Sequence, residues 1–112
     1  MQNQGEEDNW MEKLAKMKTS FNGLQIIQEH EDELDPNEFA LALRYIGNNF
    51  VRLPTDQKND FSNDPRFEKI IKNVLRFMSD LNSKGLIDLL IFIRLSKQHK
   101  ITINFDKNHF ST

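Results

Sequence analysis

The sequence of 112 residues contains no cysteine. The chain therefore cannot form a disulfide framework, a thiolate zinc site or a cysteine nucleophile. It also lacks a long apolar run: the longest, residues 86–95, is about half as long as a membrane-spanning helix and contains Asp88 and Arg94. The first ten residues are acidic and have no apolar stretch, unlike a secretory signal or an arginine-rich transit peptide. We expect an intracellular chain without a membrane span.

A strong net charge is missing as well, since the formal charge is −2. Proteins that bind nucleic acids usually carry a clear excess of Lys and Arg on one face. The charges are unevenly distributed, however: residues 1–47 hold ten acidic and four basic side chains, and residues 48–112 hold seven and eleven. The carboxyl half is therefore the basic half. The length predicts one domain with a modest core, because folding at this size buries about two thirds of the unfolded surface.

Apolar residues recur every three to four positions near the amino terminus. Within residues 1–20, Trp10, Leu14 and Met17 share one helical face, which predicts an amino-terminal helix or cap. We expect Trp10 to be the exposed aromatic residue. The same period then predicts the first helix of a hairpin that covers residues 21–47. Its apolar positions are Phe21, Leu24, Ile26 and Ile27.

The second helix of this hairpin has a sharp start signal. Asp35 can cap it, Pro36 suits the first helical position, and Glu38 can close a capping box. Gly47 followed by Asn48 predicts the end of the helix, because both residues tolerate the left-handed conformation that ends many helices. The apolar face between these signals consists of Phe39, Ala42, Leu43 and Ile46.

Residues 48–63 are polar and predict a long surface loop. They contain Pro54 and are rich in aspartate and asparagine from Asp56 onward. We expect a few apolar residues to hold this loop against the domain. These residues are Phe50, Val51, Leu53 and Phe61.

A second hairpin is predicted over residues 64–96. Asp64 with Pro65 repeats the cap-plus-proline signal, and Asn82 or Ser83 caps the last helix. That last helix is apolar on nearly all sides, so it needs neighbours on more than one side. In the tail, residues 97–112, the alternation of apolar residues fits either a strand or an extended segment that packs back on the helices. The alternating residues are Ile101, Ile103 and Phe105.

The two hairpins match as an internal repeat when the sequence is shifted by 47 residues. We therefore predict an all-α fold of two stacked antiparallel helical hairpins, like the start of an α-solenoid, in which each unit buries its apolar face against the next. The surplus apolarity of residues 86–95 then indicates a missing neighbour, either further repeats or a partner protein. The shift aligns Asp35 with Asn82, Leu43 with Leu90, and Ile46 with Ile93.

The segment DPRFEKIIKNVLRFMSDLNSKGLIDLLIFIRL, residues 64–95, resembles the helical repeats of the octotricopeptide and FASTK-like organellar RNA-binding families. LDPNEFALALRYIG, residues 34–47, is similar to them more weakly. The resemblance implies a non-catalytic module in a mitochondrion that binds single-stranded RNA along the repeat surface. It also implies that basic side chains contact the phosphates. The candidates are Arg66, Lys69, Lys72 and Arg76, although cations at this spacing are also typical of an ordinary solvated helix face.

Protein binding is the open alternative. In this hypothesis the chain is an interaction scaffold or a small accessory subunit of a large mitochondrial assembly. The over-apolar last helix and the acidic first half favour it, since a free monomer rarely exposes an apolar patch of more than about a few hundred Å². The candidate interface residues are Ile87, Ile91 and Leu95. The sequence does not determine the oligomeric state.

No pattern in the sequence indicates catalysis. His30, His99 and His109 are far apart in the chain, and Glu29 and Glu33 beside His30 lie in an acidic stretch where solvated charge is the ordinary explanation. A glycine-rich phosphate loop, a nucleophile elbow and a paired-histidine helix motif are all missing. We expect no enzymatic activity, no bound metal and no cofactor.

Overall fold

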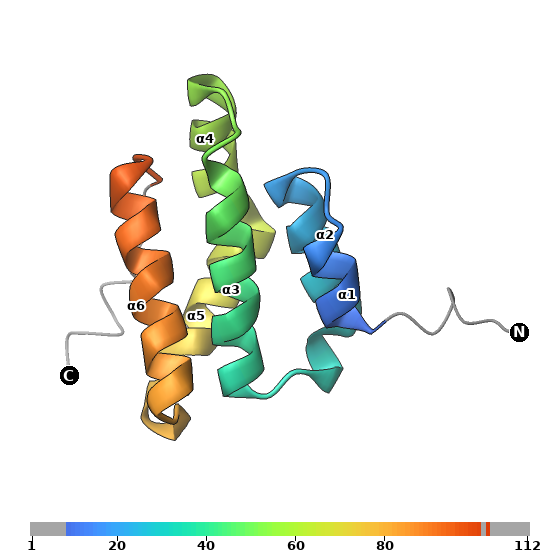
Figure 1. The fold of residues 1–112 in the computed structure, drawn as a ribbon, viewed down its shortest axis with the longest axis vertical. Helices are drawn as coiled ribbons and strands as arrows, with labels where there is room; N and C mark the ends of the chain where they lie inside the picture. Colours follow the sequence, from blue (N-terminus) through green and yellow to red (C-terminus); the bar gives the residue numbers. More distant parts are fainter. Residues whose placement is uncertain (1–8, 102, 104–112) are drawn as a thin grey trace, which may run out of the picture.

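The computed structural model describes residues 9–101 and 103. This part of the chain is all-helical, as the sequence predicts, and contains no strand (Figure 1). A short 3-10 turn follows α2 and another follows α5. The elements are α1 (Trp10–Ala15), α2 (Ser20–His30), η2 (Glu31–Glu33), α3 (Pro36–Phe50), α4 (Thr55–Ser62), α5 (Pro65–Arg76), η3 (Met78–Asp80) and α6 (Ser83–Gln98).

Helix α3 lies at the centre of the fold. It packs against α1 and α2 on one side, against α6 on the other, and in front of α5 in the view of Figure 1. The most extensive packing between helices in the described chain is between α3 and α6, so α6 packs mainly on α3 rather than on α5, the helix that precedes it. The two helices run parallel (Figure 1): the side-chain oxygen of Asn37, at the start of α3, accepts a 2.9 Å hydrogen bond from the backbone N–H of Asn82, at the start of α6.

The helix starts confirm the predicted caps. Asp35 accepts a hydrogen bond from the Glu38 backbone at 2.8 Å, and the Glu38 carboxylate accepts one from the Asp35 N–H at 2.9 Å, which completes the capping box. Asp64 caps α5, and Asn82 caps α6. These contacts form between residues two or three positions apart, so the local sequence is enough to predict them.

The predicted end of α3 at Gly47 is wrong, because the helix continues to Phe50. Gly47 does not adopt the left-handed conformation that the stop signal requires. Instead, it faces α6 so closely that an added Cβ would lie 3.1 Å from Cδ1 of Leu95 and 3.4 Å from Cδ1 of Phe92. Gly47 therefore serves the close approach of two helices rather than a helix end.

The predicted loop over residues 48–63 is also wrong, since α3 occupies its start and α4 most of the remainder. Phe50, Leu53 and Phe61 are buried as expected, whereas Val51 is exposed. The ring of Phe61 lies 5.1 Å from that of Phe50 and 4.6 Å from that of Phe67, measured between centroids. This packing orders a segment whose polar composition predicts no helix.

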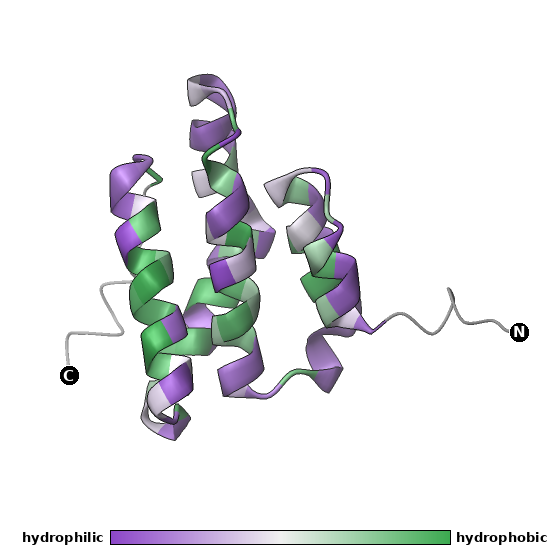
Figure 2. Cartoon of the chain, in the orientation of Figure 1, coloured by the Kyte–Doolittle hydropathy of each residue, from purple (hydrophilic) through white to green (hydrophobic). Residues whose placement is uncertain are grey.

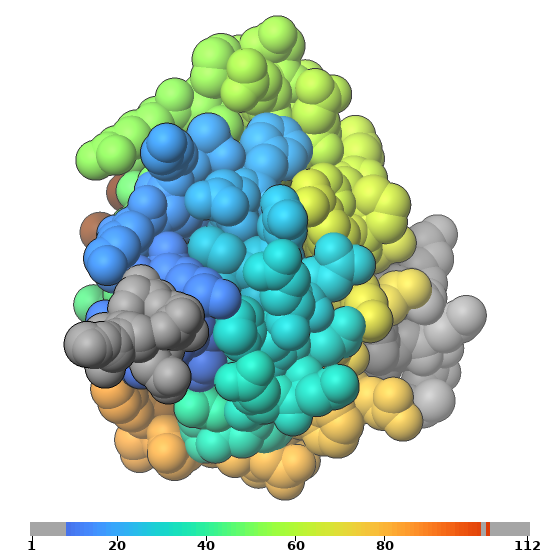
Figure 3. Space-filling model, turned by 90° about the vertical axis from the view of Figure 1, so that its right-hand side faces the viewer, coloured from blue at the N-terminus to red at the C-terminus, as the bar shows by residue number. Residues whose placement is uncertain are grey.

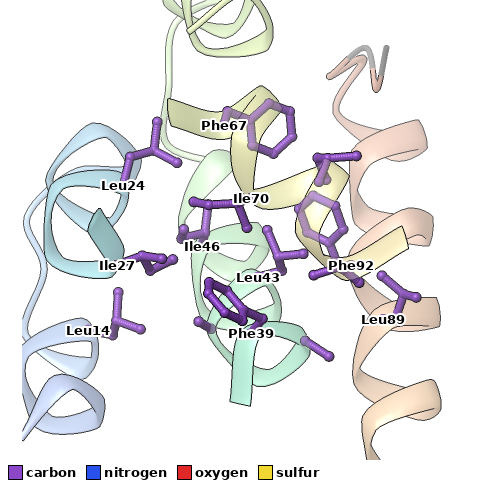
Figure 4. Packing of buried hydrophobic residues seen from close by; sticks show 14 of the residues in the cluster. Leu14, Leu24, Ile27, Phe39, Leu43, Ile46, Phe67, Ile70, Leu89 and Phe92 are labelled. Atoms are coloured by element: carbon purple, nitrogen blue, oxygen red, sulfur yellow. The ribbon is translucent and has the colours of Figure 1, made fainter. Parts of the chain in front are cut away.

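Within the described residues, the core joins α1 to α6 around these aromatic rings. Phe92 of α6 lies 5.6 Å from Phe50 and 6.0 Å from Phe67, and aliphatic side chains of α2, α3 and α5 fill the space beside them (Figure 4). Trp10 is buried rather than exposed, because α1 packs against α2 and α3. The labelled aliphatic residues in Figure 4 are Leu14, Leu24, Ile27, Leu43, Ile46, Ile70 and Leu89.

The chain reverses at the end of α6. Lys100 adopts a left-handed conformation with φ of 59°. The N–H of Ile101 donates to the Ser96 carbonyl at 2.8 Å, and that of Lys100 donates to the Lys97 carbonyl at 3.3 Å, the pattern of a Schellman motif. Ile101 is buried, and Ile103 lies with Ile71, Val74, Leu75, Leu89 and Ile93 between α5 and α6. Residues 101 and 103 therefore pack back on the helices and form no strand, whereas Phe105 lies outside the described residues.

Over residues 9–101 and 103, no helix is both long enough and apolar enough to cross a bilayer.

Candidate functional site

The four basic residues singled out on α5 do not form a free cationic track. Arg66 is tied to the capping carboxylate of Asp64: its Nε donates at 3.0 Å and its Nη2 at 2.8 Å, while its backbone N–H donates at 2.8 Å. These hydrogen bonds lower the pKa of Asp64 below its ordinary value of 3.8 and raise that of Arg66. The charge of Arg66 is therefore paired with Asp64, and the pair stabilises the start of α5.

The other three cations differ in their surroundings. Lys69 pairs with Glu31 at 3.0 Å and joins α5 to η2. The guanidinium carbon of Arg76 lies 5.5 Å from the ring centroid of Phe77, a cation–π contact. Lys72 is exposed, and its side chain makes no hydrogen bond or ion pair within the described chain. Of the four predicted phosphate contacts, only Lys72 is free of an internal partner in that part of the structure.

Arg66 and Lys69 lie on the rim of a shallow groove between α2 and α5. The two helices are neighbours on the face that Figure 3 turns toward the viewer, where α2 is cyan and α5 is yellow. The floor is apolar and consists of side chains that are themselves buried, so little of it can be reached from outside. The groove is lined by Leu24, Ile27, Gln28, Glu31, Phe39, Arg66, Lys69, Ile70 and Asn73.

Among the described helices, the most exposed leucine and isoleucine side chains lie on the outer side of α6. Leu86, Ile87 and Leu90 are 41%, 55% and 63% exposed, although they lie in the first half of a helix that packs against the core with its other side. Ile91, one turn after Ile87, is half-buried. In Figure 2 the middle of α6 is green, and its two ends are purple. We refer to Leu86, Ile87, Leu90 and Ile91 as the α6 patch.

The predicted interface residues fall in two different environments. Ile87 and Ile91 belong to the α6 patch, whereas Leu95 is half-buried and touches α3 beside Gly47. Sequence reasoning missed Leu86 and Leu90, since its interface candidates were only Ile87, Ile91 and Leu95. No sequence signal gives this rotation, because an aspartate ordinarily lies in water. The structure buries Asp88 instead, and at about 100° per residue this turns positions 86, 87 and 90 outward.

Asp88 is buried in contact with α3, at 1% exposure. Its carboxylate accepts a hydrogen bond from Nη1 of Arg44 at 2.8 Å and another from Nζ of Lys84 at 3.2 Å. It is the only acidic residue of α6. Arg94 and Lys97, by contrast, are exposed and make no ion pair in the described structure. The charge that α6 offers to solvent is therefore positive.

His30 is held between two charged side chains. Its Nε2 lies 3.0 Å from Nζ of Lys13, and its Nδ1 lies 2.7 Å from the Glu33 carboxylate. This chain of contacts joins α1 to the end of α2. In residues 9–101 and 103, no group of three or more histidine, cysteine or acidic side chains is arranged to hold a metal ion.

A scan against protein families, a search of curated proteins and a search of solved structures each found no match to the chain. The resemblance to organellar RNA-binding repeats therefore stays a prediction. The surface feature of the described chain that most resembles a binding site is the α6 patch.

Proposed function

We propose that this chain is a non-catalytic helical binding module that binds a partner protein through the outer face of α6. The observation that carries the proposal is the exposure of Leu86, Ile87 and Leu90 on one helix face. Apolar side chains that stay in water contribute little to the free energy of folding, because the hydrophobic effect stabilises the fold only through apolar surface that is removed from water. Contiguous exposed apolar residues are typical of interaction sites.

The relation between the two hairpins supports the same proposal. Helix α3 lies beside α6 and α2 lies beside α5, so the equivalent helices of the two matching segments are neighbours. This arrangement favours a solenoid-like stack of two units, in which α6 is the last helix among the described residues. The outer face of a terminal helix is where a further unit or a partner packs in such arrays.

Single-stranded RNA is the second candidate ligand. It is favoured by Lys72, whose ammonium is exposed without an internal partner in the described residues. Binding of phosphate at the neighbouring positions would have to break the ion pairs of Arg66 with Asp64 and of Lys69 with Glu31. The cost of breaking these pairs makes RNA the weaker of the two candidates.

Site-specific photo-crosslinking distinguishes the two ligands. A photoreactive amino acid is placed at Ile87 on α6 or, in the matched variant, at Lys72 on α5, and cells that express each chain are irradiated. We expect a protein adduct from position 87 that survives ribonuclease treatment, and none from position 72. The additional substitution Leu90→Glu should abolish the adduct without unfolding the chain, because Leu90 is 63% exposed.

A ribonuclease-sensitive adduct at position 72, with none at position 87, would replace protein by RNA as the ligand. Binding of labelled single-stranded RNA to the purified chain should then weaken with salt, with a slope of about −0.7 per phosphate neutralised. The absence of any adduct at position 87 would overturn the proposal of protein binding.

A further inference from the structure

The α6 patch has the geometry to receive another helix. Residues 86 and 90 form one row along α6, and residues 87 and 91 form a second row, because side chains four positions apart lie one above the other. Rows of this kind are the ridges that pack into the grooves of a neighbouring helix. The apolar surface covers the first half of the exposed side of α6, from Leu86 to Ile91.

An extended peptide fits this surface poorly. Strand-like ligands bind by hydrogen bonding to the free backbone groups of a sheet edge. The N–H and C=O groups in the middle of α6 are already paired within the helix, so an extended ligand would bury backbone groups without partners. A helical ligand satisfies its own backbone and presents only side chains.

The charge of the surrounding surface restricts the ligand further. Arg94 lies one turn beyond Leu90, and Lys97 follows one turn later, both exposed and without internal partners in the described residues. The single carboxylate of α6, that of Asp88, is buried and already accepts from Arg44 and Lys84. An incoming helix therefore meets apolar side chains first and then cations that lack counter-charges.

A second copy of this chain would not match the surface. In a two-fold symmetric contact the same patch of both copies meets itself. Two α6 helices, related in this way and centred on the patch, would bring the Lys84 end of one copy toward the Arg94 end of the other. Like charges across an interface oppose binding.

We propose that the α6 patch binds an amphipathic helix of a partner protein whose apolar stripe is flanked by aspartate or glutamate. The apolar stripe covers Leu86, Ile87, Leu90 and Ile91, and the carboxylates pair with Arg94 and Lys97. This inference rests on the proposed function and adds the chemistry of the partner to it.

Two peptides of equal length test the charge argument. Both carry the same leucine stripe at helical spacing; one has glutamate at the flanking positions and the other has lysine. Fluorescence anisotropy with the full chain should give at least about tenfold tighter binding of the glutamate peptide, since charge complementarity selects between them. Arg94→Glu with Lys97→Glu should reverse the preference. The matched variant on α5, Lys72→Glu with Arg76→Glu, should leave it unchanged.

Identification of the segment crosslinked to position 87 provides the second test. We expect mass spectrometry to find a protein segment with acidic residues beside an apolar helical stripe, and we expect the Arg94→Glu and Lys97→Glu variant to lose the adduct. A protein adduct on a basic or uncharged segment overturns the acidic-helix inference and leaves the proposed function intact. The absence of a protein adduct overturns both.

Three further outcomes would also overturn the inference. The first is equal binding of the two peptides or binding of neither. The second is a dimer of the full chain in light scattering that Leu90→Glu dissociates, which assigns the patch to a second copy. The third is co-sedimentation of the full chain with phosphatidylserine vesicles that Leu90→Glu abolishes, which assigns the patch to an anionic membrane surface.

Discussion

The buried carboxylate of Asp88 accepts a 2.8 Å hydrogen bond from the guanidinium of Arg44, 44 positions earlier in the chain. The contact joins the middle of α6 to the middle of α3. It also explains the rotation of α6, because turning Asp88 away from α3 would separate it from Arg44. Since Asp88 faces inward, Leu86, Ile87 and Leu90 face outward. The pair therefore connects the packing of the core to the surface that we propose for binding.

Arg44→Ala should destabilise the fold more than Lys84→Ala, although both residues donate to Asp88. We expect a loss of about 1–3 kcal/mol for Arg44→Ala, the range for leaving a buried polar group without its partner. Lys84 is 70% exposed and four residues from Asp88, so its removal should cost only about 0.3–0.5 kcal/mol. Urea denaturation of both variants measures the difference. The double variant Arg44→Met with Asp88→Leu should recover much of the lost stability, because it removes both charges together. Equal losses for Arg44→Ala and Lys84→Ala would contradict the assignment of Arg44 as the main partner of Asp88.

Phe61→Ala should be among the most damaging single substitutions, with a loss of about 3–5 kcal/mol. Its ring is fully buried and packs against those of Phe21, Phe50 and Phe67. Val51→Ala is the matched control in the same segment, since Val51 is exposed. Denaturation midpoints compare the two variants. If residues 48–63 were a loop on the surface, both substitutions would have similarly small effects.

Asp35→Ala should lower the free energy of unfolding by about 1 kcal/mol, because it removes the side chain that caps α3. The loss includes the hydrogen bond to the Glu38 backbone at 2.8 Å. Asp32→Ala removes a nearby exposed carboxylate that makes no hydrogen bond in the described chain and serves as the control. Thermal unfolding that shows equal effects of the two substitutions would assign the effect to charge rather than to capping.

The pair of Arg66 with Asp64 should make stability depend on pH. Its hydrogen bonds lower the pKa of Asp64, so the pair stabilises the fold above the ordinary pKa of 3.8, and this contribution is lost as the pH falls through the lower pKa of the folded state. We expect Arg66→Ala to be less stable than the parent near neutral pH, and the difference to shrink below about pH 4. Denaturation measured across this range tests the expectation, with Lys72→Ala as a control of the same charge. A difference that stays constant down to strongly acidic pH would show that Asp64 is not its source.

Lys100→Gly should stabilise the chain by about 1 kcal/mol. A residue with a Cβ is strained by about that much in the left-handed conformation, whereas glycine adopts it without strain. Lys100 has a φ of 59° and ends α6 in a Schellman motif. Lys97→Gly is the opposite control: it lies within the last turn of α6, where glycine should destabilise the helix by about 1 kcal/mol. Stability changes of the same sign in both variants would contradict the role of the backbone conformation.

The sequence predicts well those features that depend on neighbouring residues. The capping box of Asp35 and Glu38 and the cap at Asp64 form within three residues, so no distant part of the chain has to be known. The apolar residues of α5 recur at the spacing of one helix face, which is equally local, and four of them are buried: Phe67, Ile70, Ile71 and Val74. The all-helical class follows from these signals together.

Only the tertiary structure decides the features that depend on contacts between distant segments. Gly47 is a stop signal in isolation, but the proximity of Phe92 and Leu95 makes it a point of close helix packing. Residues 55–62 have no apolar period, and their helix depends on the burial of Phe61 among rings of other helices.

For the candidate site, too, one property follows from the sequence and another depends on the tertiary structure. The amino-acid sequence alone determines that α6 has more apolar surface than one neighbour can cover, because nearly every side of the helix is apolar. A helix of that kind has no single preferred rotation, since several of its faces would pack equally well. The rotation is chosen by the contact of Asp88 with Arg44, which brings together residues 44 positions apart. Which leucines and isoleucines reach the surface is therefore a property of the folded structure, because a buried charge tolerates only the orientation in which its partner is present.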